Sequence, residues 1–311
     1  MIRYDPTMQV LDRHEVGPDA EPERLDRVAH RAFAAFASRS AARKAVKRGE
    51  VLLDGVLEPS SRWVNPGQVV TLVESSLPLP PVYPLSELGV PYEDDHLAIV
   101  EKPPGLRVNG ARYRTLENAL SPHLRPSTRP DALRFPRPAH RLDGPTGGLV
   151  AIAKTGSALA GLSEAFHKRV VTKRYAAIVI GRLEGEGRVT TPIEERSADT
   201  HWAAVAHARS LKPDWVTRVE LFPHTGRTHQ LRRHMAGLGH PILGDTLYFR
   251  EGQVLRGKGV FLWAVALQLT HPITGEPLHV RIDAPVKFDT FMAREQRRWD
   301  RWQAKEGLSS P

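Results

Sequence analysis

A carboxylate that could take part in catalysis lies in a glycine-rich stretch near the middle of the chain. Asp143 belongs to HRLDGPTGG (residues 140–148), which directly precedes an apolar run. A carboxylate on such a loop can approach a substrate closely, because glycine lets the backbone turn freely. Asp-Gly-Pro is also favourable turn chemistry, so these residues alone favour a turn-forming role for Asp143 over a catalytic one.

A second polar segment, TGRTHQLR, ends one expected strand and opens an expected helix over residues 228–238. We expect Thr228 to cap this helix and Leu231 to lie on its apolar stripe. Arg227 then lies at the helix N-terminus, where a positive charge is unfavourable by about 0.3–1 kcal/mol unless an anion is near. Asp143 or a bound phosphate would supply that anion, so Arg227 is a candidate partner for Asp143.

An aromatic residue ends the third segment, KRY at residues 173–175, which opens an apolar strand. Tyr175 has two interpretations. It can be an ordinary half-buried strand aromatic, which is the commoner case. It can also stack on a nucleic-acid base.

The elements that must position these segments follow one another at irregular spacing. Besides the helix over 228–238 we expect one over 157–169, and strands over 97–102, 149–154, 173–180, 216–222, 261–270 and 278–283. Several of these strands alternate polar with apolar residues, which is typical of antiparallel pairing. We therefore predict an α+β fold with a mixed, largely antiparallel sheet and flanking helices. No glycine-rich dinucleotide or phosphate loop follows a strand, so we expect no nucleotide cofactor.

A smaller unit with its own pattern precedes this region. It begins with helical apolar spacing from residue 24, continues with a short helix capped by Ser38 or Ser40, and ends with two strand-like runs around an Asp54-Gly55 turn. We divide the chain into a tail (1–21), a small α/β domain (22–75), a proline-rich linker (76–89), a large domain (90–287) and a charged C-terminal tail with a surface helix (288–311).

Basic residues crowd the short helix of the small domain: Arg39, Arg43, Lys44, Lys47 and Arg48. Arg43 and Lys47 are four residues apart, as are Lys44 and Arg48, so two rows of positive charge cover one side. Like charges at this spacing are unfavourable by roughly a few tenths of a kcal/mol per pair, which phosphate oxygens would offset. A solvated helix face is the alternative interpretation.

The overall charge favours a polyanion as partner. The chain has 44 Lys and Arg against 35 Asp and Glu, a net charge of +9, and neutralising phosphates releases counterions. The lack of cysteine excludes disulfides, thiolate nucleophiles and cysteine-ligated metal sites. No apolar run approaches the roughly 20 residues that span a bilayer, and the N-terminus lacks a secretory signal. We expect a cytoplasmic protein without a membrane partner.

The small domain resembles a known RNA-binding module. Its strings RLD from Arg24, SRSAARK from Ser38, GEV from Gly49 and VNPGQ from Val64 look like those of the S-four-type RNA-binding domain. An Asp-Gly turn stands where Asn-Gly is usual. The resemblance implies that the basic residues of the short helix bind RNA.

The large domain resembles the RluA-type family of RNA pseudouridine synthases. Its polar segments match that family's HRLD with a following TxG, KxY at a strand start, and TGRTHQxR, in the same order. The resemblance spans about residues 90–287. One departure is Gly147, which stands where the family usually has serine. The preceding Gly144-Pro145 pair is also less typical.

The resemblance implies a reaction and roles for the site residues. A pseudouridine synthase detaches the uracil of a uridine, turns it and rejoins it through C5, and uses no metal or cofactor. Asp143 would initiate the rearrangement, by attack on carbon or by removal of a sugar proton, with Arg227 as its partner. Tyr175 would contact the target base and assist proton removal from C5, and Leu231 would pack against the site. Arg141 would fill the space that the target uridine vacates; a structural ion pair is its alternative.

The residues that lead into the Asp143 loop are also rich in arginine. Residues 121–141 hold five arginines and five prolines against one acidic residue. We interpret this stretch as an arm that clasps RNA. A solvated loop is the alternative.

Other function classes fit less well. A metal hydrolase is suggested by His224, His229, His234 and His240, but residues five apart do not share a helix face as residues four apart do. A glycoside hydrolase needs a second carboxylate about 5–10 Å away, for which only Asp245 is plausible. We therefore predict a monomeric pseudouridine synthase that acts on structured RNA, ribosomal RNA first and transfer RNA second. The main alternative is a catalytically inactive RNA-binding relative that acts in RNA folding or ribosome assembly.

Overall fold

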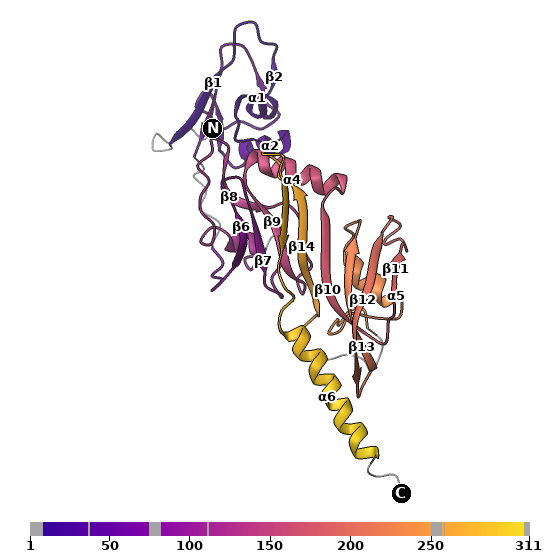
Figure 1. The fold of residues 1–311 in the computed structure, drawn as a ribbon. Coiled ribbons are helices and arrows are strands. Elements are labelled where there is room, and N and C mark those ends of the chain that lie inside the picture. Colours follow the sequence, from indigo (N-terminus) through magenta and orange to yellow (C-terminus); the bar gives the residue numbers. More distant parts are fainter. Residues whose placement is uncertain are drawn as a thin grey trace.

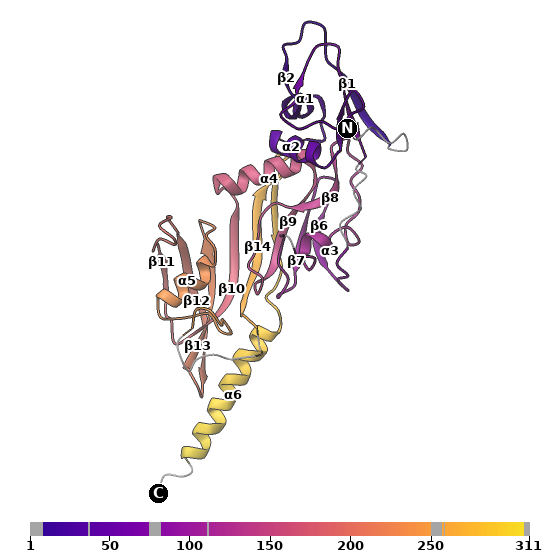
Figure 2. The same ribbon diagram turned by 180° about the vertical axis from the view of Figure 1, so that it is seen from behind.

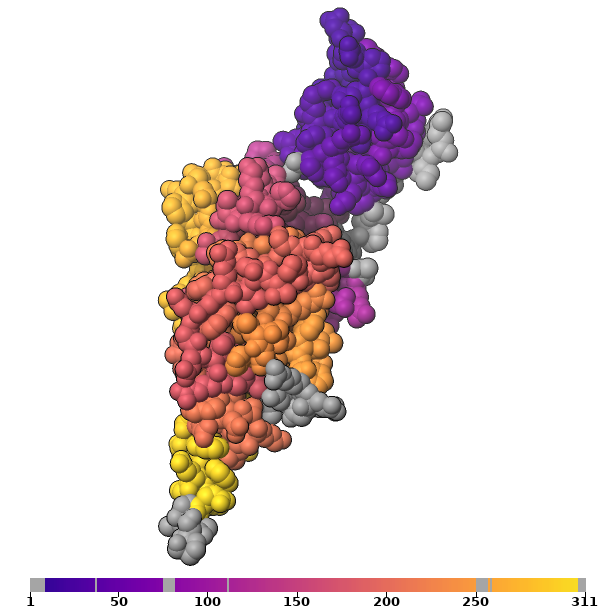
Figure 3. Space-filling model, turned by 90° about the vertical axis from the view of Figure 1, so that its right-hand side faces the viewer, coloured from indigo at the N-terminus to yellow at the C-terminus, as the bar shows by residue number. Residues whose placement is uncertain are grey.

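The computed structural model describes residues 9–36, 38–74, 82–110, 112–249, 257 and 259–307. These residues form a small N-terminal domain and a large domain built on one long sheet, which lie end to end in an elongated molecule (Figure 1). The small domain is a separate lobe in the space-filling view (Figure 3). No helix within the described ranges is both long and apolar enough to cross a membrane.

The small domain packs two helices on a three-stranded antiparallel sheet of order β1-β5-β3, beside a short two-stranded ladder of β2 and β4. Its elements are β1 (Val10–Glu15), β2 (Glu23–Arg24), α1 (Leu25–Ala32), α2 (Arg39–Lys47), β3 (Val51–Leu53), β4 (Trp63–Val64) and β5 (Val69–Val73). The Ser38 hydroxyl caps α2 by accepting from the Ala41 N–H at 3.2 Å. Asp54 and Gly55 both have positive φ, which confirms the predicted turn after β3.

Part of the predicted N-terminal tail is a strand instead. Residues 10–15 form β1, which pairs antiparallel with β5. The side chains of this edge strand are mostly exposed, so it has no apolar face by which its sequence could be identified. Of the predicted linker, residues 76–81 lie outside the described part of the chain, and Tyr83 packs against the core of the large domain.

The large domain is built on a ten-stranded sheet of order β11-β12-β13-β10-β14-β9-β7-β6, with β15 beside β14 and β8 beside β9. Its strands are β6 (Gly89–Glu93), β7 (Leu97–Lys102), β8 (Ala132–Pro138), β9 (Gly147–Thr155), β10 (Thr172–Ile180), β11 (Glu186–Val189), β12 (Thr200–Ser210), β13 (Asp214–Pro223), β14 (Leu262–Thr270) and β15 (Pro277–Arg281). Among the named strands of the described residues, only β9 and β14 pair in parallel. The predicted α+β class with a mixed, largely antiparallel sheet is confirmed.

The helices of the large domain are α3 (Leu116–Ala119), α4 (Gly156–Lys168), α5 (Gln230–Gly237) and α6 (Lys287–Gly307). Helix α4 lies across one end of the strands β10 and β14 (Figures 1 and 2) and buries Ala158 and Leu162. Helix α5 packs on β12 and β13. The predicted strands and the helix over 157–169 lie within two residues of observed elements.

The C-terminal segment is more than a charged tail. Helix α6 buries Phe288 and Phe291 against Phe261 of the sheet domain. Further along the helix, the Trp299 ring lies 3.9 Å from the Arg209 guanidinium, which also lies 4.6 Å from the Trp215 ring. The rest of α6 projects from the molecule (Figure 1).

The arginine-rich stretch before the Asp143 loop is attached to the sheet rather than extended. Its strand β8 pairs with β9. Three of its arginines form ion pairs within the domain: Arg125 with Glu93, Arg129 with Asp95 and Arg137 with Glu117. Such exposed pairs contribute about 0–1 kcal/mol each. The predicted arm is therefore part of the sheet, with part of its positive charge already neutralised.

Candidate active site

The loop between β8 and β9 carries Asp143 and is held at both ends. At its start, His140 Nε2 accepts from the Ala151 N–H at 2.9 Å, and the imidazole stacks on Phe166 with 4.3 Å between ring centroids. Burial, assisted by the charge of Lys173, lowers the pKa of His140 to about 3. The imidazole is therefore neutral at physiological pH, as an acceptor of a backbone N–H must be.

After Asp143, hydrogen bonds to the backbone of Gly144 hold the loop. Its carbonyl accepts from the Gly105 N–H at 2.7 Å and from Lys102 Nζ at 3.3 Å. The Lys102 side chain is fully buried and also donates to the carbonyls of Pro103 and Leu106. Burial lowers the pKa of Lys102 to about 7, and the Asp143 carboxylate opposes that shift.

The departure at Gly147 has a steric explanation. A Cβ on Gly147 would lie 2.2 Å from an atom of the Trp263 ring, on the neighbouring strand β14. At Gly148, whose φ is +110°, a Cβ would lie 2.3 Å from the Ala264 carbonyl oxygen. Real Cβ atoms do not approach so closely, so serine at position 147 is incompatible with this position of Trp263. The Trp263 ring occupies the space instead and supports the loop.

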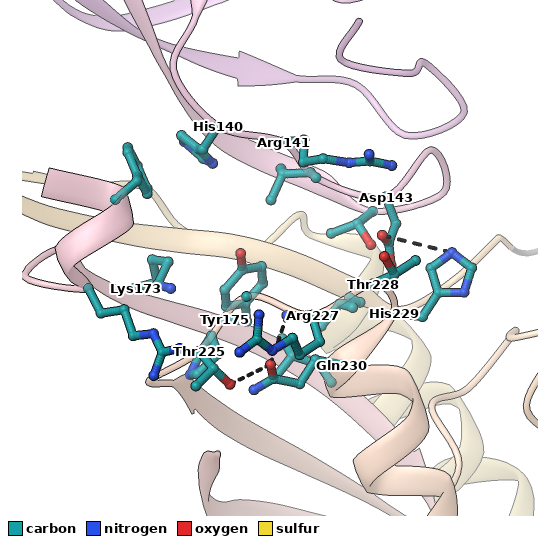
Figure 4. Close-up of a pocket in the computed structure, with 18 of the residues that line it drawn as sticks. His140, Arg141, Asp143, Lys173, Tyr175, Thr225, Arg227, Thr228, His229 and Gln230 are labelled. Carbon is teal, nitrogen blue, oxygen red and sulfur yellow. Dashed lines mark hydrogen bonds and ion pairs between the residues drawn. The ribbon is translucent and has the colours of Figure 1, made fainter. Parts of the chain in front are cut away.

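A cavity of about 430 Å³ separates this loop from the β13–α5 junction. All three predicted catalytic residues line it, as do Arg141 and Leu231. The other residues of its wall include His140, Thr146, Phe166, Lys173, Thr225, Thr228, His229, Gln230 and Leu262. Figure 4 shows Asp143 and Arg141 on one side of the cavity, with Tyr175 and Arg227 facing them from the other.

The positive partner of Asp143 is Arg232, and the predicted pairing with Arg227 is wrong. Arg232 Nη1 lies 3.7 Å from Asp143 Oδ2, and His229 Nε2 lies 3.9 Å from Oδ1. Arg227 instead donates through Nε to the carbonyl of Ser197 at 3.0 Å. Arg227 therefore shares the cavity with Asp143 without forming an ion pair with it.

The reason for this difference is the start of α5. The helix begins at Gln230, and its N-cap is His229 with a φ of 55° rather than Thr228. Gln230 Oε1 accepts from the backbone N–H of Arg227 at 3.0 Å and from the Thr225 hydroxyl at 2.6 Å. Arg227 consequently precedes the helix, while Arg232 lies in its first turn on the buried side.

Arg232 is fixed by a second carboxylate. Its Nε and Nη2 donate to the two Asp245 oxygens at 2.6 and 2.7 Å, in a buried bidentate pair. Burial opposes ionisation of Asp245, but the hydrogen bonds from Arg232 and from the Leu247 N–H hold the pKa of Asp245 below its usual range. The guanidinium thus has a fixed orientation, with Nη1 left to face Asp143.

Tyr175 enters the cavity from β10, between β13 and β14. Its hydroxyl points toward the loop that carries Asp143 (Figure 4). Burial raises the pKa of the Tyr175 hydroxyl well above its usual range, and the negative charge of Asp143 raises it further. The phenol is therefore protonated at neutral pH.

One buried polar atom of the cavity wall has no partner. Thr146 is 2% exposed, and its Oγ1 accepts or donates no hydrogen bond within the described structure. An unsatisfied buried hydroxyl costs about 1–3 kcal/mol. A polar group of a substrate bound in the cavity could satisfy it.

Arg141 lies at the mouth of the cavity and is exposed. Within the described residues its guanidinium forms no ion pair, so no structural pair supports the alternative there. Leu231 is buried in the cavity wall, where packing against the site was predicted.

The predicted RNA-binding residues of α2 divide into two groups. Arg39 donates to the buried Asp26 carboxylate at 3.0 Å, and Arg48 makes a bidentate pair with Glu50. Arg43, Lys44 and Lys47 are exposed and have no acidic partner among the residues that the structure covers. The second group leaves positive charge available on the helix surface.

The histidines that suggested a metal site have separate roles. His234 hydrogen-bonds to Thr200 and to the Thr191 carbonyl, His240 bonds to the Ile180 carbonyl, and His229 bonds to Tyr248. Within the ranges described, no group of three or more His, Asp or Glu side chains could hold a metal ion.

Four residues that support this site were not assigned by sequence reasoning: Lys102, His229, Arg232 and Asp245. His229 and Arg232 lie within the TGRTHQLR segment, and the buried side of α5 was the signal for Arg232. Lys102 and Asp245 lie in strings that match the family, KPPG from Lys102 and GHPILGD from Gly239, but these strings do not show which residues they contact.

Known proteins resemble this chain along most of its length. The family model described as RNA pseudouridylate synthase matches residues 96–237. An uncharacterized RNA pseudouridine synthase of Aquifex aeolicus is 34% identical over 305 residues, covering 90% of this chain and 96% of that protein. The ribosomal large subunit pseudouridine synthase D of Vibrio parahaemolyticus is 34% identical over 89% of this chain and 92% of its own.

A further relative and a solved structure each match about two thirds of this chain. The dual-specificity RNA pseudouridine synthase RluA of Haemophilus influenzae is 37% identical over 67% of this chain and 96% of its own. The structure of human RNA pseudouridylate synthase domain containing 1 superposes with a TM-score of 0.55 at 27% identity, over 66% of this chain and 87% of that one. The cavity is built from the loop, strand and helix segments that the resemblance singled out. Together with these relatives, it shows that this chain belongs to the RNA pseudouridine synthase family, whose members are isomerases.

Proposed function

We propose that this enzyme converts specific uridines of structured RNA into pseudouridine, and that the Asp143 carboxylate initiates the reaction. The observation that carries the proposal is the position of this carboxylate. It lies on a loop fixed by His140 and Lys102, inside a cavity, with the Arg232 guanidinium 3.7 Å away. The Asp143 side chain is 18% exposed, which leaves it accessible to a substrate.

The rearrangement breaks the bond between N1 of uracil and C1′ of ribose and forms a bond between C5 and C1′. The proton on C5 is lost to the enzyme or solvent, and N1 gains one, so no atom other than these protons is exchanged. The reaction therefore consumes no cofactor. Attack of Asp143 on C1′ and removal of a sugar proton by Asp143 both begin with an ionised carboxylate, for which Arg232 supplies the opposite charge.

Tyr175 is proposed to contact the target base as a protonated phenol. Acceptance of the C5 proton requires a base in the cavity, and the charge of Asp143 opposes loss of the phenolic proton. When Asp143 bonds to C1′ or takes up a sugar proton, its negative charge is lost and no longer opposes deprotonation of the phenol. Such an order of events would let Tyr175 assist deprotonation of C5 only after Asp143 has reacted.

Arg141 and Arg227 are proposed to bind the RNA around the target uridine. A paired uridine must leave its stack to reach Asp143, which costs a few kcal/mol, roughly, per base. Arg141 is exposed at the cavity mouth and has no carboxylate partner among the described residues, so it can enter the vacated space. Arg227 lies deeper and can contact a phosphate of the flipped nucleotide, while Leu231 forms the apolar part of the wall.

Ribosomal RNA is the proposed substrate class, since relatives over nine-tenths of the chain are named as ribosomal large subunit synthases. Such a substrate would place the enzyme in the cytoplasm. The enzyme is also proposed to act as a monomer.

Release of tritium from RNA labelled at C5 of uridine tests the activity and the substrate class together. We expect release from unmodified ribosomal RNA transcripts that exceeds release from transfer RNA transcripts. Release from neither would contradict the proposed activity for this chain. Release from transfer RNA alone would retain the activity and overturn the substrate class.

A further inference from the structure

A second pocket, of about 800 Å³, lies in the small domain. It is lined by residues of the β2–β4 ladder, of the segment before β2, of α1 and by the first residue of α2. Arg24, Arg27, Arg31, Arg39 and Trp63 line it together with Glu21 and Glu23. Four arginines around one tryptophan make this pocket chemically distinct from the rest of the small domain.

Trp63 presents its indole ring to solvent. The residue is 57% exposed, whereas Val64 beside it is buried. In the ladder, Trp63 is the direct cross-strand partner of Arg24. Among the described residues, no aromatic ring or cation packs on the indole, and no acceptor takes a hydrogen bond from its Nε1. Single exposed apolar residues are common on protein surfaces, but this one lies within a group of cations.

The arginines of the pocket divide by their partners. Arg31 pairs with Glu23 at 2.6 Å, and Arg39 pairs with the buried Asp26 at 3.0 Å. Arg24 and Arg27 have no acidic partner within the described part of the chain. Arg24 is the N-cap of α1 and Arg27 lies in its first turn, and both line the pocket. Two fixed cations therefore flank two that are available to an anion.

We infer that this pocket binds an unpaired nucleotide of RNA, with its base stacked on Trp63 and the adjoining phosphates on Arg24 and Arg27. Proteins that bind single strands combine a cationic groove with an aromatic ring on which a base stacks. An acidic peptide would satisfy the arginines but would not need the indole face. The inference rests on RNA as the partner of this chain and does not depend on the chemistry at Asp143.

The pocket differs from the basic surface of α2. Arg43, Lys44 and Lys47 offer charge without an aromatic ring, which suits the backbone of folded RNA. The pocket adds recognition of a base that is not paired. The small domain would then bind RNA most tightly where a helix adjoins an unpaired nucleotide.

Binding of a fluorescently labelled, short single-stranded oligoadenylate to the full-length protein, followed by anisotropy, tests this site. Oligoadenylate contains no uridine and is no substrate for the Asp143 cavity. Loss of one base–aromatic stack weakens binding roughly 5- to 150-fold, which we expect for Trp63→Ala. Trp63→Phe retains a ring and should stay within a few-fold of the unaltered protein.

Trp302→Ala is the matched control, because Trp302 is also an exposed tryptophan, at 42%, but lies on α6. An equal loss for Trp302→Ala, or no loss for Trp63→Ala, would overturn the inference. Replacement of Arg24 and Arg27 by alanine should make the salt dependence shallower by about 0.7 for each phosphate that the protein no longer neutralises. An unchanged slope would also count against it.

A fully paired RNA hairpin separates stacking from general RNA affinity. Trp63→Ala should affect binding of the hairpin far less than binding of oligoadenylate, and an equal effect would contradict base stacking. If tritium is not released but binding of oligoadenylate still depends on Trp63, the proposed activity is refuted and this site is not. Normal release without Trp63-dependent binding would refute this site alone.

Discussion

Arg232 is expected to support turnover through Asp143 and stability through Asp245, and a pair of substitutions separates the two effects. Arg232→Met alone leaves Asp245, whose side chain is fully buried, as an unpaired charge. Removing one partner of a buried pair costs roughly 3–5 kcal/mol. Adding Asp245→Asn removes that charge and keeps an acceptor for the backbone N–H groups of Leu247 and Tyr248.

The expected loss of activity follows from the 3.7 Å separation of Arg232 Nη1 and Asp143 Oδ2. At an effective dielectric constant near 20, two unit charges at this distance attract by about 4 kcal/mol. Because the Asp143 side chain is 18% exposed, solvent screens part of this, and we take about half. A loss of about 2 kcal/mol corresponds to about a 30-fold lower rate.

Single-turnover tritium release and urea unfolding measure the two effects separately. We expect the double variant to regain most of the stability that Arg232→Met loses while its rate stays about 30-fold low. Asp245→Asn alone keeps the Arg232 charge, and its rate should stay within a few-fold of normal. A double variant that is stable and releases tritium at the normal rate would show that Arg232 is only structural.

Three further predictions concern the loop and the basic helix. Gly147→Ser places an atom 2.2 Å from the Trp263 ring and should lower the free energy of unfolding by about 1–3 kcal/mol. In urea titrations, adding Trp263→Leu should restore part of this loss. An unaltered stability of Gly147→Ser would contradict the steric explanation. Folding lowers the pKa of His140 from 6.5 to about 3. As the pH is lowered past 6.5, His140 therefore takes up a proton in the unfolded chain but not in the folded one, and the free energy of unfolding should decrease by at most about 1.4 kcal/mol per pH unit. His140→Gln should remove that part of the dependence, and an identical pH profile would refute it. Alanine at Arg43 and Lys47 should weaken RNA binding and make its salt dependence shallower by about 0.7–0.9 for each phosphate left without its cation; equal affinity and slope would return α2 to a solvated face.

The sheet was predictable where each strand carries its own apolar pattern. β7 and β10 are almost continuous apolar runs, and both were located within one residue. β12 was missed because its sequence, THWAAVAHARS, is rich in alanine, which favours helix in isolation. Its pairing with β13 along ten residue pairs overrides that preference. β1 was missed because an exposed edge strand needs no apolar face.

The candidate site was predictable as three segments but not as a set of contacts. Asp143, Tyr175 and Leu231 line one cavity as the segments suggested. The partner of Asp143 was assigned wrongly because α5 begins two residues later than its pattern indicated. The later start moves Arg227 away from the helix N-terminus, and Arg232 in the first turn faces the carboxylate instead.

The supporting contacts depend on segments that are far apart in the chain. Lys102 lies 42 residues before Gly144, to which it donates, and Trp263 occupies the space above Gly147 from another strand. The sequence shows that glycine replaces serine at position 147, but it does not show that the Trp263 ring requires this glycine. Such relations follow only from the packing of the whole sheet.

The most direct test of the central role of Asp143 is tritium release by Asp143→Asn with ribosomal RNA labelled at C5. Asparagine keeps the shape of the side chain and removes its charge, so RNA binding should persist while release falls to background. Asp283→Asn, which alters an exposed aspartate outside the cavity, should release tritium at the normal rate. Normal release by Asp143→Asn would contradict the assignment of this carboxylate, even if the enzyme makes pseudouridine.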